Sequence, residues 1–237
     1  MNLSIVIPVY NEEDRIAKAV EALNAFLPGL DLKAEVIFVD DGSTDRTAET
    51  LSTTPARFAF DLLSYRPNRG KGYALKRGIL KASGEYVLFL DVDMSTPLAE
   101  LAKFREAMRR RVPVIIGSRK TAGSRVLKQQ STLRRKLGEG FSLLSNLLLV
   151  PGITDFTCGF KIFRRDAARR IFNAQRIERW GFDTEILFLA RRYGYAIQEI
   201  PVFWINDERT KVRLLKDVAR SFIDLVRTRF NALFRKY

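Results

Sequence analysis

The sequence contains no histidine among its 237 residues. This absence excludes histidine-based catalytic triads, histidine general bases and imidazole metal ligands. A metal ion bound by this chain would need oxygen ligands, which favours Mg²⁺ or Mn²⁺ over zinc. Cys158 is the single cysteine, so no intrachain disulfide can form, and a reducing cytoplasmic setting is expected. We expect Cys158 to be a small buried side chain.

Long hydrophobic runs are also missing. No apolar run approaches the roughly 18 residues that suggest a membrane span, and the first residues have a strand pattern rather than that of a signal peptide. The sequence therefore predicts no membrane-spanning helix of its own. A hydrophobic content of 46% indicates one α/β domain with a sizeable core. The formal net charge of +14 predicts an anionic partner, which could be nucleic acid, an anionic membrane surface or a phosphorylated substrate.

One stretch carries the clearest chemical signal. Residues 86–90 form a run of five apolar residues that leads directly to Asp91 and Asp93. Such a run is typical of a buried parallel strand, and open α/β sheets bind ligands beyond the carboxyl ends of these strands. The same aspartates could instead begin a turn and cap the helix that Ser95 and Pro97 open.

Strand and helix patterns alternate along the first half of the chain. The sequence predicts strands at 3–10, 34–39, 60–65, 86–90 and 112–117, and helices from residue 16 and at 47–51, 73–82 and 97–111. Polar residues follow the strands, and this arrangement indicates a Rossmann-like nucleotide-binding half with right-handed crossovers. A glycine fingerprint for dinucleotides and a Walker lysine loop are both absent, which argues against those two chemistries.

The second half of the chain contains two segments with alternative interpretations. Residues 141–150 are rich in leucine but too short to span a bilayer. This segment could lie in a groove or on the surface of a membrane, or it could be a core helix. A helix is predicted from residue 166, and a second helix ends at Arg192. Asp183, near the start of this second helix, could be only its cap. A strand is predicted at 196–204.

A basic amphipathic helix is predicted from Lys211 to the end of the chain. Its apolar face would carry Leu215, Val218, Ala219, Phe222, Val226, Phe230 and Leu233, and its polar face Lys216, Arg220, Asp224, Arg227 and Arg235. Such a helix can lie on an anionic membrane surface, although packing on the domain is the commoner use of an apolar stripe. We therefore divide the chain into a catalytic domain, 1–208, and a membrane-surface helix, 209–237.

Seven motifs together carry a family resemblance that covers nearly the whole chain. They are Pro8-Val9-Tyr10-Asn11-Glu12, Val39-Asp40-Asp41-Gly42-Ser43-Thr44-Asp45, Gly70-Lys71-Gly72, Asp91-Val92-Asp93, Gly117-Ser118-Arg119, Asp155-Phe156-Thr157-Cys158-Gly159-Phe160-Lys161 and Trp180-Gly181-Phe182-Asp183-Thr184-Glu185. In order and spacing the sequence resembles the family 2 glycosyltransferases, and within them the polyprenyl-phosphate hexose transferases of the dolichyl-phosphate β-glucosyltransferase group. The resemblance implies a GT-A fold, which is Rossmann-like and has a mixed, mostly parallel central sheet flanked by helices.

The resemblance also implies roles for individual residues. Pro8, Tyr10, Glu12, Asp41, Lys71 and Asp91 would bind the sugar nucleotide, with Asp41 accepting a hydrogen bond from uracil N3. Asp93, supported by Asp91, would hold the divalent ion that neutralises the departing diphosphate. Arg119 and Arg134, with Arg135 as the alternative to Arg134, would bind the acceptor phosphate. Asp155 is a candidate general base, or it positions Arg119 or the acceptor. Asp40, which points the other way from Asp41, is expected to tie its loop together.

The implied reaction is transfer of a hexose from a UDP-sugar to a polyprenyl or dolichyl phosphate. Direct displacement would invert the α linkage of the donor and give a β-linked product. Ser95 stands where mannosyl relatives carry a better metal ligand, so the resemblance favours glucose. A phosphate acceptor is already largely deprotonated at neutral pH, so a base is not strictly needed. We expect an enzyme attached peripherally to the cytoplasmic face of a membrane.

Two competing functions remain open on the sequence alone. The same fold could act on a soluble glycan or protein, with the C-terminal helix packed as ordinary core. The net charge alone would also fit a nucleic-acid-binding protein, but the arginines are scattered and no nucleic-acid motif is present, so no nucleic-acid partner is expected.

Overall fold

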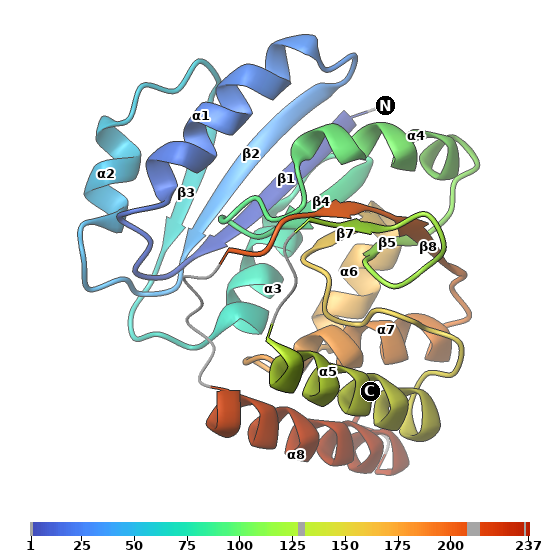
Figure 1. Ribbon diagram of the computed structural model, residues 1–237. Coiled ribbons are helices and arrows are strands. Elements are labelled where there is room, and N and C mark those ends of the chain that lie inside the picture. Colours follow the sequence, from blue (N-terminus) through green and yellow to red (C-terminus); the bar gives the residue numbers. More distant parts are fainter. Residues whose placement is uncertain (1, 128–130, 208–213, 235) are drawn as a thin grey trace.

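The computed structural model describes residues 2–127, 131–207, 214–234 and 236–237 (Figure 1). Five sequence predictions lie outside the described residues: the domain boundary at 208/209, the helix start at Lys211, and the side chains of Leu215, Lys216 and Arg235.

Alternating strands and helices make up the first half of the chain, as predicted. In order they are β1 (Asn2–Val9), α1 (Ile16–Phe26), the 3₁₀ turn η1 (Leu27–Gly29), β2 (Lys33–Asp40), α2 (Thr47–Thr53), β3 (Phe60–Ser64), α3 (Lys71–Lys81), β4 (Tyr86–Leu90), η2 (Leu98–Glu100), α4 (Leu101–Arg109) and β5 (Val114–Ser118). The helix predicted at 97–111 is shorter. Pro97 is extended and a 3₁₀ turn precedes α4, and at the other end Arg111 has a left-handed φ of 58°.

The second half adds the elements that complete the sheet and its cover. They are β6 (Arg125–Val126), α5 (Thr132–Leu148), β7 (Phe160–Arg164), α6 (Arg165–Ala174), α7 (Phe182–Arg192), β8 (Ile197–Pro201), β9 (Phe203–Trp204) and α8 (Leu214–Leu233). The strand predicted at 196–204 is divided. Its first part joins the main sheet as β8, and its end pairs with β6 as β9 in a separate two-stranded sheet.

The main sheet has the strand order β3-β2-β1-β4-β7-β5-β8. All neighbours in it are parallel except β7, which runs antiparallel to both β4 and β5. This is the mixed, mostly parallel sheet of the predicted GT-A fold. The carboxyl ends of β1, β2, β4 and β5 therefore meet at one edge, which is where an open α/β sheet binds its ligands.

The core lies on both faces of this sheet. Helices α1 and α4 cover one face and α3, α6 and α7 cover the other (Figure 1). All five residues of β4 are buried, which explains why its sequence shows no polar alternation. Cys158 is fully buried in the same core, as predicted.

Helices α5 and α8 form a further layer below α3 and α7 (Figure 1). Their contact includes Phe141 and Phe222, whose ring centroids are 5.7 Å apart. Phe141 and Ser145 of α5 are buried, whereas Leu143 and Leu147 are exposed. The leucine-rich segment is thus part of a longer helix that has both an inner and an outer face.

Burial along the C-terminal helix does not follow its two predicted faces. Asp224, predicted on the polar face, is buried, and so are Thr228 and Asn231. The reason is Gly181, because a Cβ atom there would lie 2.4 Å from the Cβ of Asp224, so only glycine lets the helix approach this closely. The helix consequently turns Val226 and Phe230 of its predicted apolar face toward solvent.

Candidate active site

A pocket of about 880 Å³ opens at the carboxyl edge of the sheet. Residues from the ends of β1, β2, β4 and β5 meet there with others from α5 and α8. Nine of the ten predicted site residues line it: Pro8, Tyr10, Glu12, Asp41, Lys71, Asp91, Asp93, Arg119 and Arg134. Arg135, the alternative to Arg134, lines it too, whereas Asp155 does not.

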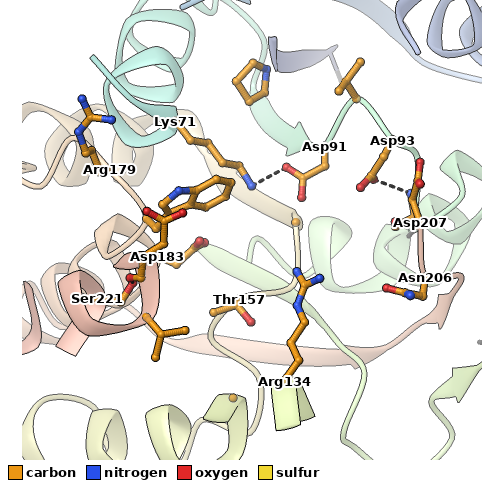
Figure 2. A pocket seen from close by; sticks show the side chains of 18 of the residues that line it. Lys71, Asp91, Asp93, Arg134, Thr157, Arg179, Asp183, Asn206, Asp207 and Ser221 are labelled. Carbon is orange, nitrogen blue, oxygen red and sulfur yellow. Dashed lines mark hydrogen bonds and ion pairs between the residues drawn. The ribbon is translucent and has the colours of Figure 1, made fainter. Parts of the chain in front are cut away.

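Asp91 sits directly after β4 and is fixed from two sides. Lys71 at the start of α3 forms an ion pair with it, with 2.5 Å between Nζ and Oδ1 (Figure 2). On its other side lies Gly159, where a Cβ atom would come within 2.1 Å of Oδ2. The glycine of the Asp155 to Lys161 motif is therefore required for Asp91 to occupy this position.

Asp93 is the second carboxylate of the pair. Its Oδ1 accepts a hydrogen bond from the backbone N–H of Ser95 at 2.9 Å (Figure 2), and Met94 between them has a left-handed φ of 51°. Burial, and then the negative charge of Asp91, raise the pKa of Asp93. Two carboxylates held together under these conditions suit a hard cation. The described residues contain no group of three or more carboxylates, cysteines or histidines that could hold a metal by themselves.

Lys71 is the main cation at the donor end of the pocket. Burial alone would lower its pKa, but the charges of Asp91 and Asp183 outweigh that effect and raise it. Asp183, in the first turn of α7, is itself paired with the buried Lys161, with 2.5 Å between Nζ and Oδ1. Asp183 is thus more than a helix cap, because it belongs to a chain of alternating charges that ends at Asp91.

Asp41 organises the loop on the far side of Lys71. Its Oδ1 accepts hydrogen bonds from the hydroxyl of Tyr65 (2.8 Å) and the backbone N–H of Arg69 (2.8 Å). Its Oδ2 accepts from the amide of Asn68 and the backbone N–H of Gly70, both at 2.7 Å. These four bonds use the acceptor positions of the carboxylate and bring β2 against the turn before α3.

Asp40 lies beside Asp41 but serves a different purpose. Its Oδ1 accepts from the backbone N–H and the hydroxyl of Ser43, at 2.9 and 2.5 Å. This confirms the prediction that Asp40 ties its own loop together.

Arg119 and Asp155 form a two-pronged ion pair at the other end of the pocket. Nε donates to Oδ2 and Nη2 donates to Oδ1, both at 2.7 Å, and the backbone N–H of Arg119 adds a third bond at 3.0 Å. Although burial acts to raise it, the pKa of Asp155 is held far below its usual range by these contacts with Arg119. A carboxylate so poor at accepting a proton fits the positioning role predicted for Asp155 better than the role of a base.

Arg134 lies on the first turn of α5, and its guanidinium points into the pocket (Figure 2). Burial and the positive charge of Arg119 both lower its pKa. Among the described residues no carboxylate forms an ion pair with it. Two guanidinium groups facing one cavity, one of them without a counterion, suit a doubly charged anion.

Sequence reasoning gave no part in ligand binding to several residues that line this pocket. They include Arg15, Arg179, Trp180, Asp183, Asn206, Asp207 and Arg220. Trp180 and Asp183 fall within a recognised motif, which was the available signal. Arg15 precedes α1, Arg179 precedes α7, Asn206 and Asp207 follow β9, and Arg220 lies on α8. Only the folded chain brings these residues to the pocket, for example by the contact of Arg15 Nη1 with Asp207 Oδ2 at 3.6 Å.

Comparisons with known proteins agree with this geometry. Residues 4–172 match the model of glycosyl transferase family 2. The chain is similar to the dolichyl-phosphate beta-glucosyltransferase of Dictyostelium discoideum, with 36% identity over 98% of this chain and 75% of the relative. It is also similar to the enzyme of the same name from Homo sapiens, with 34% identity over 89% of this chain and 69% of the relative. The enzyme of that name from Saccharomyces cerevisiae has 34% identity over 99% of this chain and 76% of the relative.

Among solved structures, the fold is similar to glucosyl-3-phosphoglycerate synthase from Mycobacterium tuberculosis. One structure of that enzyme, with Mn²⁺, UDP and glucosyl-3-phosphoglycerate, has a TM-score of 0.70 at 21% identity over 96% of this chain and 79% of the other. Another, with Mg²⁺ and UDP, has a TM-score of 0.69 at 19% identity over 96% and 77%. Taken with the family match and the relatives above, this shows that the chain is a GT-A glycosyltransferase belonging to glycosyltransferase family 2.

Proposed function

We propose that this enzyme transfers glucose from UDP-glucose to the phosphate of a dolichyl or other polyprenyl phosphate and so forms a β-linked lipid-phosphate sugar. The observation that carries the proposal is a single pocket that holds a paired carboxylate site at one end and two arginines at the other. The relatives are named dolichyl-phosphate beta-glucosyltransferases, which supports the acceptor and the sugar.

At the donor end, Pro8, Tyr10, Glu12, Asp41 and Lys71 would hold the nucleotide. Because Asp41 already accepts four hydrogen bonds, a uracil N3–H would have to take the place of one of them. The side-chain amide of Asn68 is the donor that can rotate away. The other three donors are the hydroxyl of Tyr65, which packs against the core, and two backbone N–H groups. Lys71, next to Asp91, is placed to balance negative charge on the diphosphate.

Asp93 and Asp91 would hold a divalent ion, Mg²⁺ or Mn²⁺. Their proximity and the raised pKa of Asp93 fit a cation at this point, and solvent and diphosphate oxygens would complete its ligands. When bound, the ion supplies Lewis-acid stabilisation of the departing diphosphate. Structures of the fold's relatives contain Mn²⁺ or Mg²⁺ together with UDP.

At the acceptor end, Arg119 and Arg134 would bind the lipid phosphate. Asp155 keeps the Arg119 guanidinium in one orientation, so that its remaining surface faces the pocket. The phosphate oxygen needs no base, because it is largely ionised at neutral pH. Attack on the anomeric carbon from the side opposite the diphosphate would break the donor's α linkage and form a β linkage.

The outer face of α5 and α8 supports a membrane-bound acceptor. No helix in the described part of the chain is both long enough and apolar enough to cross a bilayer. Of the fourteen large apolar side chains exposed in that part, nine lie on α5 or α8 and Phe234 directly follows α8. We call this surface the α5/α8 face. It consists of Leu133, Leu143, Leu144, Leu147, Leu148, Ile223, Val226, Phe230, Leu233 and Phe234.

This face has the properties of a surface that lies on an anionic bilayer. Apolar side chains exposed over two neighbouring helices are uncommon on a protein that remains in water. Arg135 and Lys136 of α5 and Arg227 and Arg229 of α8 are exposed on the same helices, where they can meet anionic headgroups. The enzyme would then be peripheral, with residues 1–208 as the catalytic domain and 209–237 as an attachment helix, at the cytoplasmic face.

The test is transfer of radiolabelled glucose from UDP-glucose into an organic-extractable product. The assay contains purified protein, a short polyprenyl phosphate and Mg²⁺ or Mn²⁺, with 3-phosphoglycerate as a soluble acceptor in a parallel reaction. We expect label in the lipid phase, abolished by EDTA. UDP binding without lipid transfer would keep the donor site but refute the acceptor, and label in 3-phosphoglycerate alone would favour the soluble alternative.

A further inference from the structure

A second cavity, of about 370 Å³, lies between the start of α3, the segment that joins α6 to α7, and the C-terminal half of α8. Its size is within the range of small-molecule sites. Six charged side chains line it: Arg69, Lys76, Arg176, Arg227, Lys236 and Glu178. Five of these are basic and one is acidic, so the cavity is strongly positive.

The single acidic residue does not neutralise the cavity. Glu178 is already paired with Arg69, with 3.3 Å between Nε and Oε2 in one of their two contacts. None of the other four cations forms an ion pair with a carboxylate of the described residues. Glu185 acts on Lys76 and Asp224 on Arg227, but neither pair is an ion pair within 4 Å. Because five positive charges converge here with one paired carboxylate among them, the folded chain is expected to bind an anion at this place.

Two of these cations are held in place by the backbone. Lys76 Nζ donates to the carbonyl oxygens of Asn173 and Gln175 at 3.1 and 2.8 Å, and Arg176 Nε donates to the carbonyl of Lys236 at 2.8 Å. An ammonium has three donors and a guanidinium five, so both groups keep N–H donors for a ligand. Cations fixed in this way differ from mobile lysines and arginines on a solvated surface.

The cavity is separate from the active-site pocket but shares two walls with it. In the segment before and at the start of α3, Arg69 and Tyr73 face this cavity, whereas Gly70 and Lys71 face the active site. In the segment before α7, residues 175–178 face this cavity, and 179–180 face the active site. Occupancy of one cavity can therefore bear on the other through these two segments.

We propose that this cavity is a second anion-binding site that takes a phosphate-bearing ligand, outside the active centre. Guanidinium and ammonium groups together bind phosphate oxygens by charge-assisted hydrogen bonds. Arg227 brings the site to the edge of the α5/α8 face, since it lies on α8 next to the exposed Val226. The phosphate can thus come from a soluble metabolite or from a lipid headgroup.

The experiment measures binding of inorganic pyrophosphate to the full chain by calorimetry, with the active-site pocket saturated by UDP. We expect pyrophosphate to bind, and Arg227→Gln to weaken binding about tenfold or more. Arg229→Gln is the matched control, because Arg229 is exposed on the same helix but does not line the cavity. Arg134→Gln reports on binding in the active-site pocket, so the result does not depend on the proposed reaction.

A lipid arm separates the two sources of phosphate. Binding to phosphatidylcholine vesicles with and without phosphatidic acid is measured for the same variants, and pyrophosphate is added as competitor. If Arg227→Gln loses more binding to the acidic vesicles than Arg229→Gln does, and pyrophosphate competes, the ligand is a headgroup. If pyrophosphate binds but both variants behave alike on vesicles, the ligand is soluble.

Three results would overturn the proposal. They are no pyrophosphate binding to the UDP-saturated protein, equal losses for Arg227→Gln and Arg229→Gln in calorimetry, and loss caused only by Arg134→Gln. The second would mean that the net charge of the chain acts without a site, and the third that pyrophosphate enters the active-site pocket.

Discussion

The two ends of the active-site pocket are built in different ways. At the donor end, Asp41 and Asp91 follow buried parallel strands and are fixed by contacts within the chain, four hydrogen bonds for Asp41 and the Lys71 ion pair for Asp91. At the acceptor end, Arg119 is fixed by Asp155, but Arg134 comes from α5 and has no ion-pair partner among the described residues. The donor end is therefore held in place without a ligand, whereas the acceptor end contains a positive charge, that of Arg134, which a bound anion could neutralise.

This difference implies that donor and acceptor binding are separable. The helix that supplies Arg134 also supplies five side chains of the α5/α8 face. Acceptor binding should therefore respond to changes in α5 and to a membrane, whereas nucleotide binding should not. The predictions that follow test this separation.

The largest effect is expected at the donor end. Asp93→Asn removes a charge from the proposed metal site, and we expect transfer to fall by about 10²- to 10³-fold, as for other groups that stabilise developing charge. Asp61→Asn makes the same change on exposed β3 and should leave transfer unaltered. Steady-state transfer assays at saturating donor check this. Equal rates for Asp93→Asn and the unmodified enzyme would remove Asp93 from the site.

Asp155→Asn should cost about 3–5 kcal/mol of unfolding free energy, because it leaves the largely buried Arg119 without its counterion. Despite its burial, contacts with Arg119 hold the pKa of Asp155 below the ordinary value of about 4, so the unfolded chain binds more protons as the pH falls through that value. The stabilisation is therefore present above that pH and is lost below it. Urea unfolding from neutral to acidic pH should show the two proteins converging in acid. A difference that stays constant with pH would contradict this.

The donor end could be predicted from sequence because its chemistry is local. Asp91 and Asp93 immediately follow a run of five apolar residues, and a strand buried on both faces needs such a run. Asp40 and Asp41 likewise follow β2. Once strand order is set by right-handed crossovers, the ends of these strands must meet.

The parts that could not be predicted depend on contacts between distant segments. Arg15 reaches Asp207 across 192 positions of sequence, and nothing in the local pattern of either residue signals this. The burial of Asp224 depends on one close approach to Gly181. Helical periodicity defined the two faces of α8 but not which one packs inward, because polar side chains can be buried when they find partners. Thr228 does so by donating to the carbonyl of Asp224 at 2.8 Å.

Arg134→Gln should weaken the acceptor end alone. We expect the KM for the polyprenyl phosphate to rise about 10- to 100-fold, because one charged hydrogen-bond donor to the phosphate is lost. The Kd for UDP should stay unchanged. Arg135→Gln is the matched variant, because Arg135 is the next residue and also lines the pocket. Unlike Arg134, it forms an ion pair, with 3.8 Å between its Nε and Glu139 Oε1. If Arg135→Gln has the larger effect on KM, the phosphate is bound by Arg135. If both variants change UDP affinity, the two ends of the pocket are not separable.

The smallest effect is expected on the α5/α8 face. Replacing Leu147 and Phe230 together by serine removes two side chains that are 77% and 53% exposed, so the fold should keep its stability. Binding to vesicles that contain anionic lipid should weaken about tenfold, because less apolar surface enters the bilayer. Leu62→Ser on β3 is the control for loss of an exposed leucine elsewhere. Turnover of a water-soluble short-chain acceptor should not change, because no residue of the pocket is altered. If that turnover falls as far as vesicle binding, the face contributes to the pocket itself and is not only a surface for attachment.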